Sequence, residues 1–397
     1  MNLFLQRHIK TSLFNLLLVA AMGVILRYKI IFYLPFINQK HLLHGHSHFA
    51  FSGWVTHALF SLLVQHLVQK NLLQTAQRYR WILNANLVTA YGMLISFPLQ
   101  GYGLLSISFS TASIFVSFAF AIRYFKDISR LPSHTSNCWI KAALVFNVLS
   151  SVGAFSLAYM MATKSLHQNW YLAAVYFFLH FQYNGWFLFA CMGLANAYLF
   201  YHLPQQVQKK IFWLFAAACI PAYVLSALWL PLPQWTYWIV VLAACSQLAG
   251  WLLLLLQIKK TPGHVTGINW VIVLSCIALS IKLLLQLGST IPALSKLAFG
   301  FRPIVIGYLH LILLGVISLF ILGYMIANHS IDKNRLATTA IWVLAAGILL
   351  NEVLLMIQGV AAILFVPVIF INQLLLLAAL ILAGGIFLLN ISQQRRK

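Results

Sequence analysis

The sequence predicts an all-α polytopic membrane protein of about twelve transmembrane helices in three pseudo-equivalent sets of four. Of 397 residues, 62% are hydrophobic and only 7% are charged, whereas about a quarter are charged in soluble globular proteins. A spanning helix takes about 20 residues, so the chain has room for roughly a dozen spans and their connections. The third observation is a histidine pattern that recurs in every fourth predicted span.

Lys, Arg, Pro and polar residues interrupt the apolar runs and mark the ends of each span. The first run is long and lacks a small-residue cleavage pattern, so we interpret it as a retained span rather than a signal peptide. We expect one transmembrane domain over 1–397, with internal repeats near 11–124, 138–257 and 268–390. The predicted spans are 11–34, 42–69, 81–100, 104–124, 138–161, 171–201, 211–230, 235–257, 268–288, 303–327, 336–358 and 363–390.

The charge balance predicts an orientation. The chain has 25 Lys and Arg residues against 3 acidic residues, a ratio that would indicate nucleic acid in a soluble protein. Here the basic residues lie between apolar runs, where they set orientation and meet anionic lipid headgroups. With twelve spans, the joints on the side of the termini carry 18 basic residues and the opposite joints 6, while Lys282 lies within a span. We therefore expect both termini in the cytoplasm, an inner-membrane location, lipid contact and no nucleic acid partner.

The small number of acidic residues and the spacing of the cysteines exclude several kinds of site. Asp127, Asp332 and Glu352 are the only acids, and only Glu352 lies within a long apolar segment. Paired-carboxylate catalysis is excluded, and ion coupling through a chain of buried acids is disfavoured, while relays of water, His and hydroxyl groups remain open. The five cysteines form no CxxC pair, so neither a disulfide framework nor a zinc site is indicated.

A His-x4-Gly pattern recurs in spans two, six and ten. The three copies are His48-FAFS-Gly53, His180-FQYN-Gly185 and His310-LILL-Gly315. Each copy lies four spans from the next, which predicts three four-helix units around a pseudo-threefold axis. Each glycine lies about one and a half turns deeper than its histidine, where a missing side chain lets a neighbouring helix or a flat ligand approach.

An intramembrane histidine is costly unless it has a partner, and a metal is the best partner. Two imidazoles on facing helices can hold a haem from both sides. His310 follows Arg302 by eight residues, about 12 Å along a helix axis, so both lie in the outer part of the membrane. Arg302 could neutralise a haem propionate there, together with Lys296, Arg27 and Lys29. The chain has no CxxCH motif, so any haem b would be held without covalent bonds.

With these histidines, the chain resembles subunit I of the haem-copper oxidase and nitric oxide reductase superfamily. In that family a second-span His and the later His of a tenth-span His-x-His bind a low-spin haem. The resemblance assigns His310 to the low-spin haem, and Tyr308 stands where the family's active-site haem ligand would be. His180 takes the sixth-span metal position, but it is not followed by Pro-Glu, and span 211–230 contains no histidine. The resemblance therefore implies one haem and a dismantled dinuclear site.

The second-span ligand stays open among the histidines of one short segment. The internal repeat favours His48, and the family spacing equally allows His46. His44 and His48 share a helix face at i,i+4, the arrangement of a small copper site, so copper is the alternative metal. The candidate metal-ligating residues are His44, His46, His48, His180 and His310, with Arg302 as a haem-binding residue.

Other interpretations compete with haem. The polar neighbours of His180 make an interhelical hydrogen-bond network at least as plausible as a metal ligand. We expect His57 and His66 to be packing or cytoplasm-side residues and His8 to be solvated in a joint. The leading hypothesis is a b-type haem protein for electron transfer, with an electron donor or partner subunit, or for binding nitric oxide or oxygen. The alternative is a transporter or channel without haem, and an active oxidase or reductase is less favoured, so enzymatic activity is left open.

Overall fold

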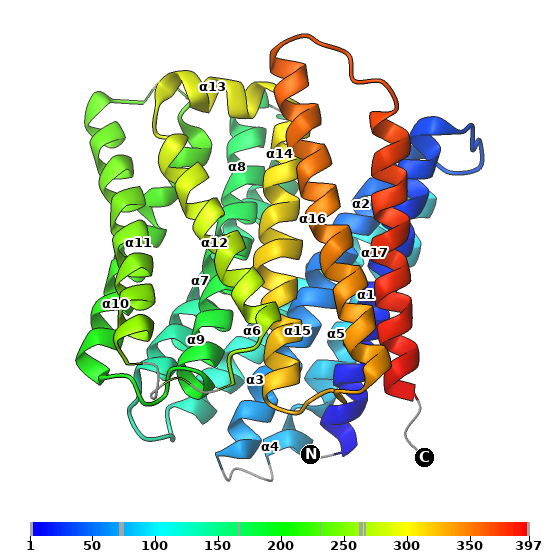
Figure 1. Ribbon diagram of the computed structural model, residues 1–397. Helices are drawn as coiled ribbons and strands as arrows, with labels where there is room; N and C mark the ends of the chain where they lie inside the picture. Colours follow the sequence, from blue (N-terminus) through cyan, green and yellow to red (C-terminus); the bar gives the residue numbers. More distant parts are fainter. Residues whose placement is uncertain are drawn as a thin grey trace. The chain divides into compact units, whose positions relative to one another are not determined.

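The computed structural model describes residues 3–70, 75–165, 167–230, 232–261, 265 and 267–394. Over these ranges every regular element is a helix (Figure 1). The longer elements are α1 (Leu3–Ile31), α2 (Gln39–Phe49), α3 (His57–Gln69), α5 (Arg80–Gln100), α6 (Leu104–Ile128), α7 (Thr135–Ala162), α8 (Gln168–His180), α9 (Leu188–Tyr198), α10 (Gln205–Cys219), α11 (Gln234–Lys260), α12 (Trp270–Gly288), α14 (Arg302–His310), α15 (Leu319–Ala327), α16 (Arg335–Ile363) and α17 (Ile371–Gln394).

The prediction of an all-α polytopic membrane protein is confirmed. Among the described residues, 10 helices are long and apolar enough to cross a membrane. A further pair, α10 and the 3-10 helix Pro221–Ala227, meets the same test but is bent by 41°. The continuous helix from α8 to α9 is long enough to span, but polar residues near its middle lower its mean hydropathy. Each of the twelve predicted ranges overlaps one of these helices.

The helices form two compact units. The first comprises Met1–Arg123 and Ile321–Lys397, and the second comprises Tyr124–Phe320. Both boundaries fall inside continuous helices, in α6 and in the helix Arg302–Ala327. The first boundary lies within one residue of the predicted end of the first repeat at 124, but the second falls inside the predicted third repeat, 268–390. The arrangement in three sets therefore stays a prediction.

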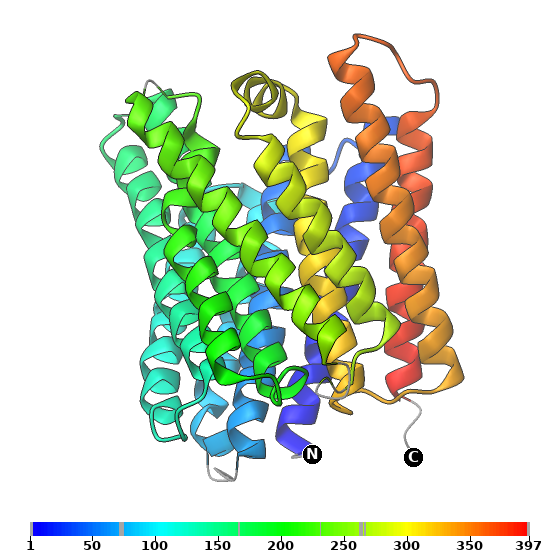
Figure 2. The same ribbon diagram turned by 60° about the vertical axis from the view of Figure 1, so that its left-hand side comes forward.

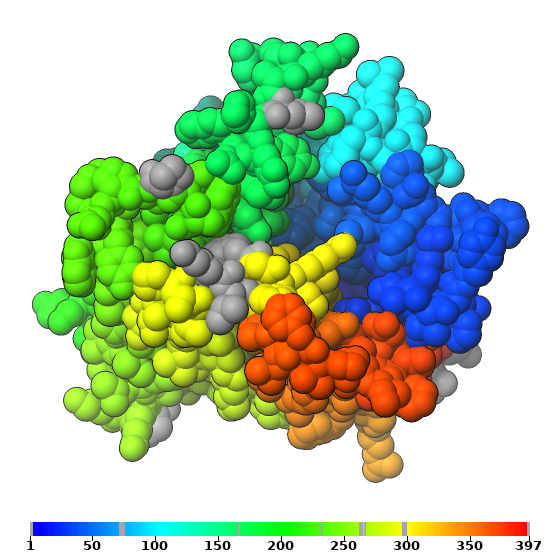
Figure 3. Space-filling view, turned by 90° about the horizontal axis from the view of Figure 1, so that it is seen from above, coloured from blue at the N-terminus to red at the C-terminus, as the bar shows by residue number. Residues whose placement is uncertain are grey.

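In the first unit, α16 and α17 run side by side and α17 packs on α1 (Figures 1 and 2). The loops that join α1 to α2 and α16 to α17 reach the same end of this unit, which faces the viewer in Figure 3. At the other end, Lys10 Nζ donates to the Gln393 carbonyl at 2.6 Å and links the start of α1 to the end of α17. This hydrogen bond holds the first and last helices of the unit together at that end.

In the second unit, α7 packs against the helix that runs from α8 to α9, and α10 runs beside α11 (Figure 2). At Gly153 of α7, an added Cβ would lie 2.5 Å from the Ala174 carbonyl oxygen of α8, so this crossing requires glycine. Large aromatic residues remain at the ends of helices with most of their surface exposed. Trp170, Trp235 and Trp238 are 69%, 63% and 65% exposed, as an aromatic belt at a membrane interface would be.

Candidate functional site

The three histidine spans share an unusual backbone conformation. A π-helical segment follows each histidine, at Ala50–Thr56, Phe181–Phe187 and Leu311–Ser318. Each segment contains the glycine of the His-x4-Gly pattern. π-Helices are rare, occur mostly as short bulges and are frequent at functional sites. The repeat seen in the sequence therefore has a matching local structure in all three spans.

In the first π-helical segment, side chains from other helices bind the backbone carbonyls. Asn15 of α1 donates to the Gly53 carbonyl at 2.6 Å, and Asn86 of α5 donates to the Ser52 carbonyl at 3.2 Å. A π-bulge disturbs the regular i to i−4 hydrogen-bond ladder, so carbonyl groups there need other donors. The two asparagines supply them and hold the bulge in place.

The third π-helical segment is held in the same way, because Ser275 of α12 donates to the Val316 carbonyl at 2.7 Å. The glycines bring the preceding helix close. A Cβ at Gly185 would lie 2.6 Å from Cβ of Phe146 in α7, and one at Gly315 would lie 3.1 Å from Cβ of Ala278 in α12. The expectation that a neighbouring helix approaches these glycines is confirmed at both positions.

His310 is the last residue of α14, and its ring is bound through Nδ1. Nδ1 lies 2.8 Å from the Ile306 carbonyl oxygen, one turn earlier. A carbonyl oxygen only accepts, so Nδ1 carries the proton and Nε2 carries a lone pair. Metal-bound histidines usually have this arrangement, because the second hydrogen bond fixes the ring and its tautomer. Arg302, the first residue of α14, is exposed; the side chain of Lys296 lies outside the described residues.

His46 has the same arrangement in the first unit. Its Nδ1 lies 3.1 Å from the Val19 carbonyl oxygen, so its ring points to α1 and its Nε2 carries the lone pair. An added Cβ at Gly23 of α1 would lie 3.5 Å from Cε1 of His46, which places the ring in the contact between the two helices. Both ring positions are therefore set by the protein itself.

His48 points elsewhere. Its Nε2 lies 3.2 Å from the Tyr102 hydroxyl, and its ring stacks on Phe97 with 4.3 Å between centroids. His44 contacts the same tyrosine, at 4.6 Å between ring centroids. His44 and His48 thus share a face, as predicted, and that face is different from the one that carries His46. The buried Nε2 of His44 has no hydrogen-bond partner among the described residues.

These contacts bear on the copper alternative. Across the described part of the chain, no group of three or more His, Cys, Asp or Glu residues is arranged to hold a metal ion. A copper ion at this face would have two imidazole ligands, from His44 and His48, beside the Tyr102 hydroxyl. Two-coordinate sites of this kind suit monovalent copper better than metals with higher coordination numbers.

His180 is held by both ring nitrogens. Nε2 donates to the Cys219 carbonyl at 2.8 Å, and Nδ1 accepts from the Asn184 amide at 3.1 Å. Gln182, two residues later, donates to Asn147 and Ser150 of α7. The structure thus contains the interhelical hydrogen-bond network that competes with metal ligation at this position. A metal at His180 would have to displace one of these two hydrogen bonds.

Sequence reasoning did not single out Lys282 in α12. Lys282 is only 2% exposed, and its Nζ donates to Gln286 Oε1 at 2.5 Å. Gln286 in turn donates to Gln247 of α11 at 2.7 Å. A buried amine inside a membrane span indicates a functional site by default. The signal was present in the sequence, because Lys282 is the one basic residue that the charge count assigned to no joint.

The expectation that His8 is solvated in a joint was wrong. α1 begins eight residues before the predicted start of the span, so His8 lies inside the helix and is only 6% exposed. Its Nδ1 lies 3.2 Å from Nε2 of His57, which is fully buried, and Nδ1 of His57 lies 3.2 Å from the amide nitrogen of Asn86. The buried His57 is therefore a member of a hydrogen-bonded chain.

No protein family model matches this chain, and no curated protein is significantly similar to it. The resemblance to the oxidase superfamily therefore stays a prediction from the histidine pattern.

Proposed function

We propose that this protein is an integral membrane haem protein that transfers single electrons. His310 and His46 would hold one non-covalent haem b, and Arg302 would neutralise one of its propionates. His48 is the alternative second ligand. Bound haem would supply a one-electron redox centre, and ligation by two histidines leaves no position for a gas, which favours electron transfer over binding of nitric oxide or oxygen.

The hydrogen bonds of His310 and His46 carry this proposal. Each ring donates its Nδ1 proton to a backbone carbonyl of its own unit and so presents Nε2 as a lone-pair donor. This is the tautomer that metal ligation through Nε2 needs. His48 instead contacts Tyr102 through Nε2, the nitrogen that would bind the iron. We therefore assign the ligand role to His46, whose contact with a backbone carbonyl is through Nδ1. The proposed electron donor, or a partner subunit, would exchange electrons with the haem.

The proposal includes a membrane arrangement. We propose twelve spans in three four-helix sets, in the inner membrane, with both termini in the cytoplasm. The recurrence of a π-helical segment after His48, His180 and His310 supports the three sets. The excess of basic residues in the joints on the side of the termini supports the orientation.

An optical spectrum of the purified protein tests the haem. Protein prepared in mild detergent from haem-replete cells should show a reduced-minus-oxidised spectrum of the b type with about one haem per chain. His310→Ala and His46→Ala should each abolish the low-spin spectrum. His48→Ala should retain it, because its Nε2 contacts Tyr102. Size-exclusion profiles of all variants serve as the folding control.

Three results would overturn this assignment in whole or in part. A colourless wild-type preparation would show that the protein binds no haem. A spectrum that is retained in His310→Ala would show that His310 is not a haem ligand. Loss of the spectrum in His48→Ala but not in His46→Ala replaces His46 by the alternative ligand. Metal analysis of the same preparation also tests copper at the His44 and His48 face, which His44→Ala should remove.

A transporter or channel is the second candidate function, and the buried polar chain of Lys282, Gln286 and Gln247 favours it. Such a chain offers donors and acceptors inside a span, as a pathway for a polar solute would. Solute uptake by proteoliposomes of haem-free protein, lost in Lys282→Met, would support this function. A haem-loaded protein without uptake would exclude it.

A further inference from the structure

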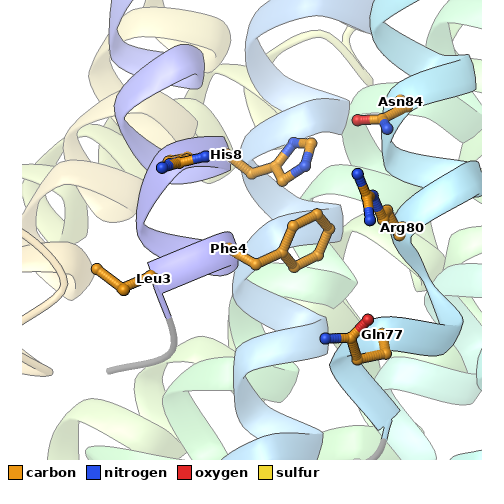
Figure 4. Close-up of a pocket in the computed structure, with 7 residues that line it drawn as sticks. Leu3, Phe4, His8, Gln77, Arg80 and Asn84 are labelled. Carbon is orange, nitrogen blue, oxygen red and sulfur yellow. The ribbon is translucent and has the colours of Figure 1, made fainter.

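The first unit contains a cleft of about 410 Å³ at the end where α1 and α5 begin. Figure 4 shows His8 and Phe4 projecting from α1 toward Arg80 and Asn84 of α5. Arg7, Gln77 and Leu3 complete the lining. The seven lining residues, all described, include two guanidinium groups and no acidic side chain.

The buried hydrogen-bonded chain behind this cleft has a fixed direction. The Asn86 amide nitrogen donates to the Ser52 carbonyl, which only accepts, so this nitrogen is also the donor to Nδ1 of His57. A neutral His57 with an accepting Nδ1 carries its proton on Nε2 and donates it to Nδ1 of His8. His8 then carries its own proton on Nε2.

The charged side chains of the cleft and its buried histidine therefore offer only hydrogen-bond donors. The His8 N–H is the end of a donor chain that starts at the Asn86 amide of α5, and hydrogen bonds in such a chain strengthen one another. Arg7 and Arg80 add guanidinium donors, which bind phosphate in a bidentate manner. His8 is nine-tenths buried and lines the cleft, so its N–H is a fixed donor rather than a mobile surface group.

We infer that this cleft binds a phosphate-type anion, either the phosphodiester of an anionic lipid headgroup or free phosphate. Guanidinium groups and an N–H donor match the acceptor oxygens of a phosphate. Leu3 and Phe4 in the lining provide apolar surface beside the charged groups, as a headgroup with attached acyl chains needs. This inference does not depend on the haem or on the orientation of the protein.

The test uses the full-length protein in nanodiscs of phosphatidylcholine alone or mixed equally with phosphatidylglycerol. Native mass spectrometry counts retained anionic lipid, and calorimetric titration of inorganic phosphate into the phosphatidylcholine discs measures free phosphate. Arg7→Gln with Arg80→Gln should weaken binding by about tenfold or more, as expected when charge-assisted hydrogen bonds are lost. His8→Phe, which keeps a ring but removes the N–H, should weaken it less.

The matched control is Lys70→Gln with Arg78→Gln, which removes the same charge near this end of the unit but outside the cleft lining. This variant should bind as the wild type does. Lipid retention without phosphate binding identifies a headgroup site, and saturable phosphate binding identifies a free-anion site. Binding of neither anion overturns the inference, and so does an equal loss in the control variant.

Discussion

Gly385 of α17 lies against the backbone of Leu344 in α16, so closely that an added Cβ would stand 2.7 Å from the Leu344 amide nitrogen. At Gly384, one residue earlier, an added Cβ meets no described atom within 4 Å. Small residues let membrane helices approach in this way, and packing drives their association when lipid replaces water. Of these two adjacent glycines, only Gly385 lies at the close contact between the helices.

We expect Gly385→Ala to destabilise the protein by about 1–3 kcal/mol, because overpacking forces the two backbones apart. Gly384→Ala should leave stability unchanged within about 0.5 kcal/mol or raise it, since alanine favours helix. Denaturant-induced unfolding in one detergent measures both variants. Equal losses in the two variants would contradict the assigned contact between α16 and α17.

Asn86 has a structural role that its neighbour Asn84 lacks. It donates to His57 and to the Ser52 carbonyl inside the first unit, whereas Asn84 is exposed in the cleft. Asn86→Ala leaves two buried acceptors without donors and should cost about 1–3 kcal/mol. Asn84→Ala is the control and should cost much less. Thermal unfolding in the same detergent compares them, and an Asn86→Ala protein as stable as the control would contradict the network.

Much of the fold could be predicted from the sequence, because the apolar runs and their basic joints follow directly from the needs of spanning helices. The start of α1 was missed because Arg7 and Lys10 resemble a joint in the sequence, although both lie within the helix. The π-helical segments could not be foreseen, since no residue pattern here distinguishes them from α-helix. His46 and His48 could not be told apart either. Side chains two residues apart in a helix point in directions that differ by more than half a turn. The neighbours of His46 and His48 therefore depend on how α1 and α5 pack against this helix.

Substitutions at Lys282 and Gln286 separate the free-energy cost of burying an amine from the stabilisation that its hydrogen bond provides. Lys282→Met keeps a straight side chain but removes the amine, whose burial is unfavourable, so stability should be unchanged or higher. Gln286→Leu instead leaves Lys282 without its acceptor and Gln247 without its donor, and should cost about 1–3 kcal/mol. Unfolding in detergent measures both. A large loss in Lys282→Met would show that the amine binds a group that stabilises the second unit.

The continuous helix Gln168–Tyr198 decides the number of spans, because it is long enough to cross but less apolar than the others. Lys164 precedes it and Lys209 follows it, and both are exposed. If this helix crosses the membrane, the two residues lie on opposite sides, with Lys209 in the cytoplasm by the positive-inside rule. In a protein whose five cysteines are replaced by alanine, Lys164→Cys should react with a membrane-impermeant maleimide in intact cells.

Lys209→Cys should react only after the cells are permeabilised, and Lys333→Cys, in a joint predicted on the same side, should behave identically. The side-chain environment favours reaction in each case, since all three positions are exposed. Labelling of Lys164→Cys and Lys209→Cys under the same condition would mean that the helix does not cross. The histidine of the sixth span would then not lie at the depth of His48 and His310, and the proposed threefold arrangement would fail.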